Sequence, residues 1–190
     1  MDQYELERYG LPAIDRSWYW AAVKMAAAVT PKRYALKRFR SEVRQLIDLA
    51  DRAEINAASD QVTIARLTGM EPYSCNWSLL MVLDHLCLFI GDMTKLIDGL
   101  SGTAKLHGQF SDYQYEPDPD VNMDVIDRFA RVANEFDTCV VGMSGLRGNR
   151  RFRHSWLGWM NAHQWLCWTA AQTRIRRRHA IQIRNVAGVV

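Results

Sequence analysis

Four long segments of this chain repeat their apolar residues every three to four positions, and that period constrains the fold more than any other feature. The spacing places apolar side chains on one face of an α-helix, whereas a half-buried strand would alternate every second residue. The segments cover about 31–52, 76–100, 125–143 and 160–186, and none shows sustained alternation. With 190 residues, 48% of them hydrophobic, the chain can bury one core. The sequence therefore predicts an all-α four-helix bundle.

The chain before the first of these segments is predicted to add a further helix. Residues 17–29 carry an aromatic run followed by alanines, which favours a helix. We therefore expect residues 1–30 to form an N-terminal helical extension and residues 31–190 to form the bundle, within one domain. Thr30 and Pro31 suit the start of the next helix, as a capping residue and a first-turn proline.

Two connections between the predicted helices are too long to be tight turns. The polar stretch from 56 to 76 is expected to hold a short helix around 61–67. The stretch from 101 to 120 is poor in helix formers, so we expect it to cross or cap one end of the bundle.

No stretch of the sequence is typical of a membrane span or an export signal. The longest apolar stretch, Ser78–Ile90, is interrupted by Asp84 and His85, and the N-terminus lacks a basic region followed by an apolar one. The 4 cysteines are widely spaced without a Cys-x-x-Cys pair, which is typical of reduced, mostly buried thiols. We expect a cytoplasmic protein that does not contact a membrane.

The net charge of +3 hides an uneven distribution along the chain. Residues 138–190 contain nine arginines and no acidic residue, whereas the rest has 15 basic and 21 acidic residues. A basic end can bind an anion or a nucleic acid. Alternatively, its arginines complement the negative end of the last helix and pair with acidic residues of neighbouring helices. No motif that reads nucleic acid accompanies them, so a nucleic-acid partner is not expected.

Two histidines lie on the apolar faces of different predicted helices. His85 comes three residues after Val82 and four before Phe89, and His179 shares a face with Ile183. Inward side chains from facing helices can build a metal site in a bundle core. Histidines that only hydrogen-bond within a core give the same pattern, so both interpretations stay open at this point.

A series of short motifs, most of them containing tryptophan or histidine, follows along the chain. They are Trp77-Ser78, Asp84-His85-Leu86, Trp156-Leu157-Gly158-Trp159, Asn161-Ala162-His163-Gln164-Trp165-Leu166 and His179-x-x-Gln182-Ile183. In this order and spacing the chain resembles, over about residues 32–186, the DinB-like family of bacterial four-helix bundles. Many members hold a divalent metal with three histidines, and the family is related to thiol-dependent S-transferases and isomerases. The resemblance implies a bundle with such a site, and a homodimer.

The resemblance also implies which residues would hold the metal. The family's first histidine lies in the second helix, as His85 does. Two more form His-x-x-x-His in the last helix, where His179 matches the second and Ile175 replaces the first. An isoleucine has no lone pair to donate. Gln172 and His163 do not substitute for it, because they lie roughly 10 Å and 24 Å from His179 along a helix axis.

This incomplete site limits the functions that we expect. Two imidazoles with waters bind zinc or nickel weakly, so no tightly bound metal is expected unless a carboxylate such as Glu42 or Asp124 completes the set. The first expectation is a bundle protein that binds a small molecule in the pocket between its helices. The alternative is a zinc- or nickel-dependent hydrolase or thiol S-transferase, in which a metal at His85 and His179 activates a thiol or a water.

The other histidines and the tryptophans near the last helix are expected to be structural. His163 is expected to brace the start of that helix, and His107 and His154 lie in loops without a partner pattern. Large aromatic side chains more often pack in a core than stack on a ligand, although both are open here. The tryptophans concerned are Trp156, Trp159, Trp165 and Trp168.

Overall fold

The computed structural model describes residues 13–102, 106, 108, 110, 115–155 and 157–187, with side chains from residue 21 onwards except that of residue 55. Within these residues the chain is mostly helical, and the predicted all-α fold class is confirmed. In chain order the elements are α2 (Ala13–Val29), α3 (Lys32–Asp51), α4 (Ile55–Ser59), the 3-10 helix η1 (Pro72–Asn76), α5 (Leu79–Ser101), α6 (Val125–Gly142), β1 (Phe152–His154), β2 (Gly158–Met160) and α7 (Ala162–Val186).

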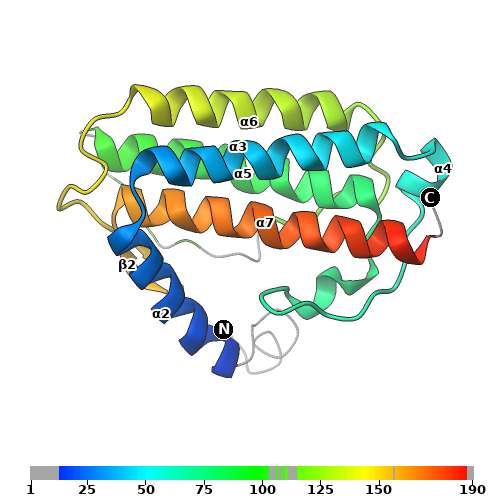
Figure 1. Cartoon of the computed structure of the whole chain (residues 1–190), viewed down its shortest axis with the longest axis horizontal. Coiled ribbons are helices and arrows are strands. Elements are labelled where there is room, and N and C mark those ends of the chain that lie inside the picture. Colours follow the sequence, from blue (N-terminus) through cyan, green and yellow to red (C-terminus); the bar gives the residue numbers. More distant parts are fainter. Residues whose placement is uncertain are drawn as a thin grey trace.

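The four longest helices of the described chain, α3, α5, α6 and α7, lie side by side (Figure 1). α5 packs extensively against α6 and α7, while α3 packs extensively against α7 and less so against α6. Every residue from Leu79 to Cys87 is buried, so this end of α5 is covered on all sides and forms the centre of the core. His85 therefore lies in the interior of the protein.

Side-chain caps fix the starts of α5 and α7. Ser78 Oγ accepts a hydrogen bond from the main-chain N–H three residues on, at 3.1 Å. Asn161 and Gln164 each accept at 3.0 Å from the other's main-chain N–H, which forms a capping box. α3 differs, because it follows Pro31 without a side-chain cap, and the capping role predicted for Thr30 is wrong.

α2 leaves the four long helices at an angle, close to the hairpin strand β2 (Figure 1). Its C-terminal end is held by hydrogen bonds to main-chain carbonyl oxygens. Arg147 donates to the carbonyls of Ala27 and Ala28, each at 3.2 Å, and His163 Nε2 donates to the carbonyl of Thr30 at 2.8 Å. His163 lies in the first turn of α7, so this bond joins the start of α7 to the end of α2, and the structural role predicted for His163 is confirmed.

The short helix predicted around residues 61–67 is wrong. This segment is extended, and the main-chain N–H groups of Val62 and Ile64 bind the carbonyl oxygens of Trp77 and Cys75, at 3.4 Å and 2.9 Å. Both donors belong to β-branched residues, which favour extended backbone. The pairing holds the chain beside the entry to α5.

A small hairpin that the sequence did not predict precedes α7. β1 and β2 pair antiparallel, and Gly158 in β2 has a φ of +72°, a conformation that glycine adopts readily. His154, at the end of β1, is fully buried and its ring stacks on that of Trp165 with 5.4 Å between centroids. The prediction of a loop histidine without partners is therefore wrong.

Candidate ligand site around Trp77

The structure places the two histidines singled out in the sequence against one side chain, Trp77. His85 on α5 is 4% exposed, and His179 on α7 is fully buried. The Trp77 ring centroid lies 5.1 Å from that of His85 and 5.7 Å from that of His179, with the latter pair inclined by only 28°. Trp77 immediately precedes the residue that caps α5, so the cap also fixes where the indole enters the core. We call Glu71, Trp77, His85, Arg176 and His179 the Trp77 cluster.

Arg176 is a member of this cluster that sequence reasoning did not assign to it. Its side chain is 1% exposed, and its guanidinium carbon lies 4.8 Å from the Trp77 ring centroid, a cation–π contact. Its Nη2 donates to Glu71 Oε2 at 2.5 Å, and Glu71 is itself buried. The three-residue spacing from His179 puts both side chains on one helix face, but the run of arginines around Arg176 is typical of a solvated face, so the sequence did not single it out.

The pairing of arginines in α7 with acidic residues of other segments is confirmed at two positions. Arg176 binds Glu71, and Arg177 Nε donates to Glu42 Oε2 on α3. Arg176 therefore lies in the interior and Arg177 at its edge, and each binds an acidic residue, as the second interpretation of the basic C-terminal segment predicted.

Several buried polar atoms of the site have no hydrogen-bond partner among the described residues. They are both ring nitrogens of His179, Nε and Nη1 of Arg176, and Oε1 of Gln182 on the following turn of α7. His85 differs, because its Nδ1 lies 2.7 Å from the carbonyl oxygen of Tyr115. A carbonyl only accepts, so His85 Nδ1 carries the proton. Buried polar groups nearly always have a hydrogen-bond partner in folded proteins, so these unpaired atoms can still form hydrogen bonds to a ligand.

Burial also keeps both histidines of the cluster uncharged. It lowers the pKa of His85 and of His179 well below the usual value, and the nearby Arg176 guanidinium lowers each pKa further. The hydrogen bond to Tyr115 raises the pKa of His85 and opposes this trend only in part. At neutral pH the cluster therefore holds two neutral imidazoles and one ion pair.

The residues present do not complete a metal site. Within the described ranges, no group of three or more His, Cys, Asp or Glu side chains is placed to hold a metal ion. Ile175 stands where the family resemblance implies a third imidazole, and it is an aliphatic core residue. The Glu71 carboxylate already accepts a hydrogen bond from Arg176. The guanidinium also repels a second cation beside the imidazoles, because like charges interact strongly in a buried environment. His85 and His179 therefore do not fit a divalent metal ion with the residues that surround them.

The remaining candidates lie elsewhere. The carboxylate of Glu42 is bound by Arg177, and Asp124 is exposed at the start of α6. Trp165 and Trp168 are fully buried, as expected for packing, whereas Trp159 is 57% exposed. His107 and Trp156 lie outside the described residues.

Comparisons with known proteins identify no relative of this chain. No protein family, no curated protein and no solved structure matches this chain. Among the described residues, none of the helices has the length and apolar character needed to cross a membrane.

Proposed function

We propose that this chain is a DinB-like four-helix bundle that binds a small oxygen-bearing ligand, such as a carboxylate, at the Trp77 cluster without a resident metal. One observation carries the proposal: His179 and Arg176 are buried, and four of their nitrogen atoms have no partner among the described residues. Carboxylate oxygens accept strong hydrogen bonds from guanidinium and imidazole N–H groups. A bound oxygen would therefore satisfy donors that are costly to leave unpaired in the interior.

The side-by-side packing of four long helices, with His85 and His179 against one tryptophan, supports the DinB-like fold and the location of its site. The homodimer follows from that resemblance and is tested by sedimentation equilibrium. All 4 cysteines are free thiols, which supports a reducing compartment such as the cytoplasm.

Thermal unfolding with sodium acetate as the probe tests the site, with sodium chloride at equal ionic strength as the reference. A ligand of the native state present at 100 times its Kd stabilises by about 2.7 kcal/mol. For a chain of this length that corresponds to a rise in Tm of roughly 5–10 °C. His179→Phe should abolish most of the rise, because it removes both unpaired ring nitrogens while keeping an aromatic side chain.

The matched control is His154→Phe, which also replaces a fully buried histidine but lies outside the cluster. This variant should keep the acetate response even where its own Tm is lower. An equal acetate response in the parent and in His179→Phe would contradict the proposal. Stabilisation by zinc or nickel that His85→Phe and His179→Phe both remove would instead favour the metal-dependent alternative.

A further inference from the structure

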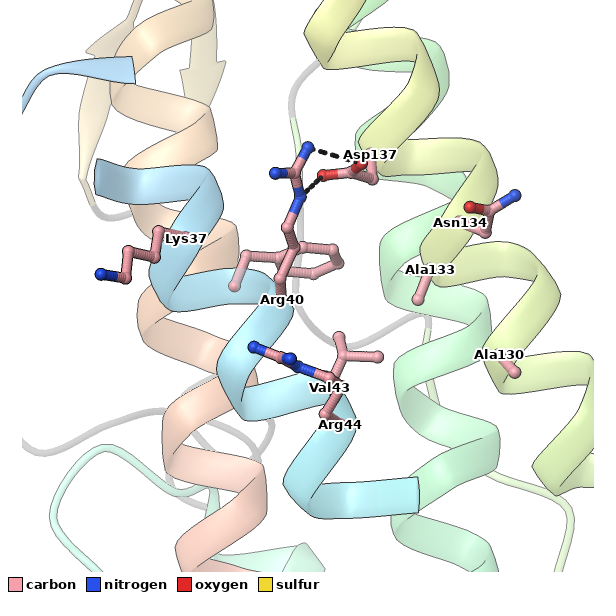
Figure 2. Close-up of a pocket in the computed structure, with 9 residues that line it drawn as sticks. Lys37, Arg40, Val43, Arg44, Ala130, Ala133, Asn134 and Asp137 are labelled. Carbon is pink, nitrogen blue, oxygen red and sulfur yellow. Dashed lines mark hydrogen bonds and ion pairs between the residues drawn. The ribbon is translucent and has the colours of Figure 1, made fainter. Parts of the chain in front are cut away.

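A groove between α3 and α6 contains none of the residues of the Trp77 cluster (Figure 2). It has a volume of about 540 Å³, and its floor is apolar, formed by Phe39, Val43, Ala130 and Ala133. We call it the α3–α6 groove. It exists because α6 presents two alanines at helical spacing towards α3, and their side chains are too small to fill the space between the helices. Its size lies in the range of about 300–1,000 Å³ that is typical of small-molecule sites.

The rim of the α3–α6 groove is mainly cationic. Lys37, Arg40 and Arg44 follow one another along α3 at spacings of three and four residues, and all are exposed. Figure 2 shows Arg40 reaching across to Asp137 on α6. Two hydrogen bonds join these side chains, from Nε to Oδ1 at 2.6 Å and from Nη2 to Oδ2 at 2.8 Å. This pair closes the groove at one point and uses the carboxylate of Asp137.

The other two cationic side chains of the rim are not neutralised by an acidic side chain of the described residues. Among the described residues, neither Lys37 nor Arg44 takes part in an ion pair. Figure 2 shows the charged end of Arg44 lying over α3, whereas the Lys37 side chain extends away from α6. The rim thus carries the Arg40–Asp137 pair and, beside it, the unpaired guanidinium of Arg44, above an apolar floor. An apolar surface bordered by unpaired positive charge is complementary to a molecule that is itself apolar and acidic.

We propose that the α3–α6 groove binds small organic anions with an apolar body. The body covers the phenylalanine, valine and alanine floor, and the acidic group lies against Arg44. A guanidinium forms paired hydrogen bonds with carboxylate, sulfonate or phosphate oxygens, so Arg44 supplies the specificity for charge. This proposal is independent of the Trp77 cluster, since the two sites share no residue.

Fluorescence titration with 1-anilinonaphthalene-8-sulfonate tests the proposal, with the uncharged N-phenyl-1-naphthylamine as the matched probe without the sulfonate. Arg44→Gln removes the charge at the rim. Arg33→Gln is its control, because Arg33 is an exposed arginine of α3 that does not line the α3–α6 groove. Ala130 is half-buried, so Ala130→Leu places a larger side chain in the space above the apolar floor. Arg44 is exposed, so Arg44→Gln leaves the core undisturbed.

We expect Arg44→Gln to weaken binding of the sulfonate by about three- to tenfold, the range for a charged hydrogen bond partly exposed to water. Arg33→Gln should change the Kd by less than about twofold. Ala130→Leu should weaken both probes, and the uncharged probe should be insensitive to Arg44→Gln. Equal effects of Arg44→Gln and Arg33→Gln would overturn the proposal. So would concentration-dependent dimerisation that excludes the sulfonate, because it would assign the α3–α6 groove to a second copy of the chain.

Discussion

Replacing Glu71 with glutamine should destabilise the protein strongly, because it leaves the Arg176 charge in the interior without its counter-charge. The two side chains are 6% and 1% exposed, and Arg176 Nη2 lies 2.5 Å from Glu71 Oε2. Removing one partner of a buried ion pair typically costs about 3–5 kcal/mol. The amide oxygen of glutamine can still accept one hydrogen bond, so we expect a loss near the lower limit, about 3 kcal/mol. The corresponding fall in Tm is roughly 6–12 °C.

Urea unfolding followed by circular dichroism measures this loss, and an exposed ion pair supplies the control. The Arg40 and Asp137 side chains are 49% and 21% exposed, so Asp137→Asn should cost only about 0.2–1 kcal/mol. The double substitution Glu71→Gln with Arg176→Met removes both charges and should recover most of the loss. The reasoning is refuted if Glu71→Gln costs no more than Asp137→Asn, since the guanidinium would then be stabilised by something other than Glu71.

Three further predictions concern the histidines and the start of α7. Burial lowers the pKa of His85 and of His179 in the folded state, so below pH 6.5 the unfolded chain binds more protons and stability falls by about 1.4 kcal/mol per pH unit for each histidine. Urea unfolding from pH 7.5 to pH 5 measures that slope, which His179→Phe should make shallower; an unchanged slope would show that His179 does not titrate on unfolding. Ile175→His adds an imidazole one turn before His179 and should raise zinc affinity by calorimetry, more so when Arg176→Met removes the repelling charge; no gain in either variant would mean that the rings do not converge. Asn161→Ala removes the capping box and should lower the free energy of unfolding, measured with urea, by about 1 kcal/mol. An unchanged free energy of unfolding would contradict this role of Asn161.

Local patterns predicted the helices well because their cause is local. The apolar spacing of Leu36, Phe39, Val43 and Leu46 corresponds to one buried face of α3, as the period requires. The hairpin before α7 was missed for the opposite reason. Each of its strands has three residues, too few for an alternating pattern to be distinguished from a loop.

The candidate site was only partly predictable. His85 and His179 could be placed in the interior because each shares a helix face with aliphatic residues. Arg176 could not be placed there, since an arginine within a run of arginines is usually solvated, and its partner Glu71 is 105 residues away in the chain. Nothing in a single sequence marks such a distant pair. The cation beside the two imidazoles therefore required three-dimensional information.

The hydrogen bonds that attach α2 determine which of its residues can be substituted. Arg147 and His163 bind the carbonyls of Ala27, Ala28 and Thr30, atoms that every amino acid carries. Substitutions at these three positions leave the acceptors in place, so α2 can diverge at exposed positions such as Ala28 while these hydrogen bonds persist, whereas the buried Ala27 has to stay small. Selection at this junction should instead fall on the two donors, Arg147 and His163, because these hydrogen bonds depend on their side chains.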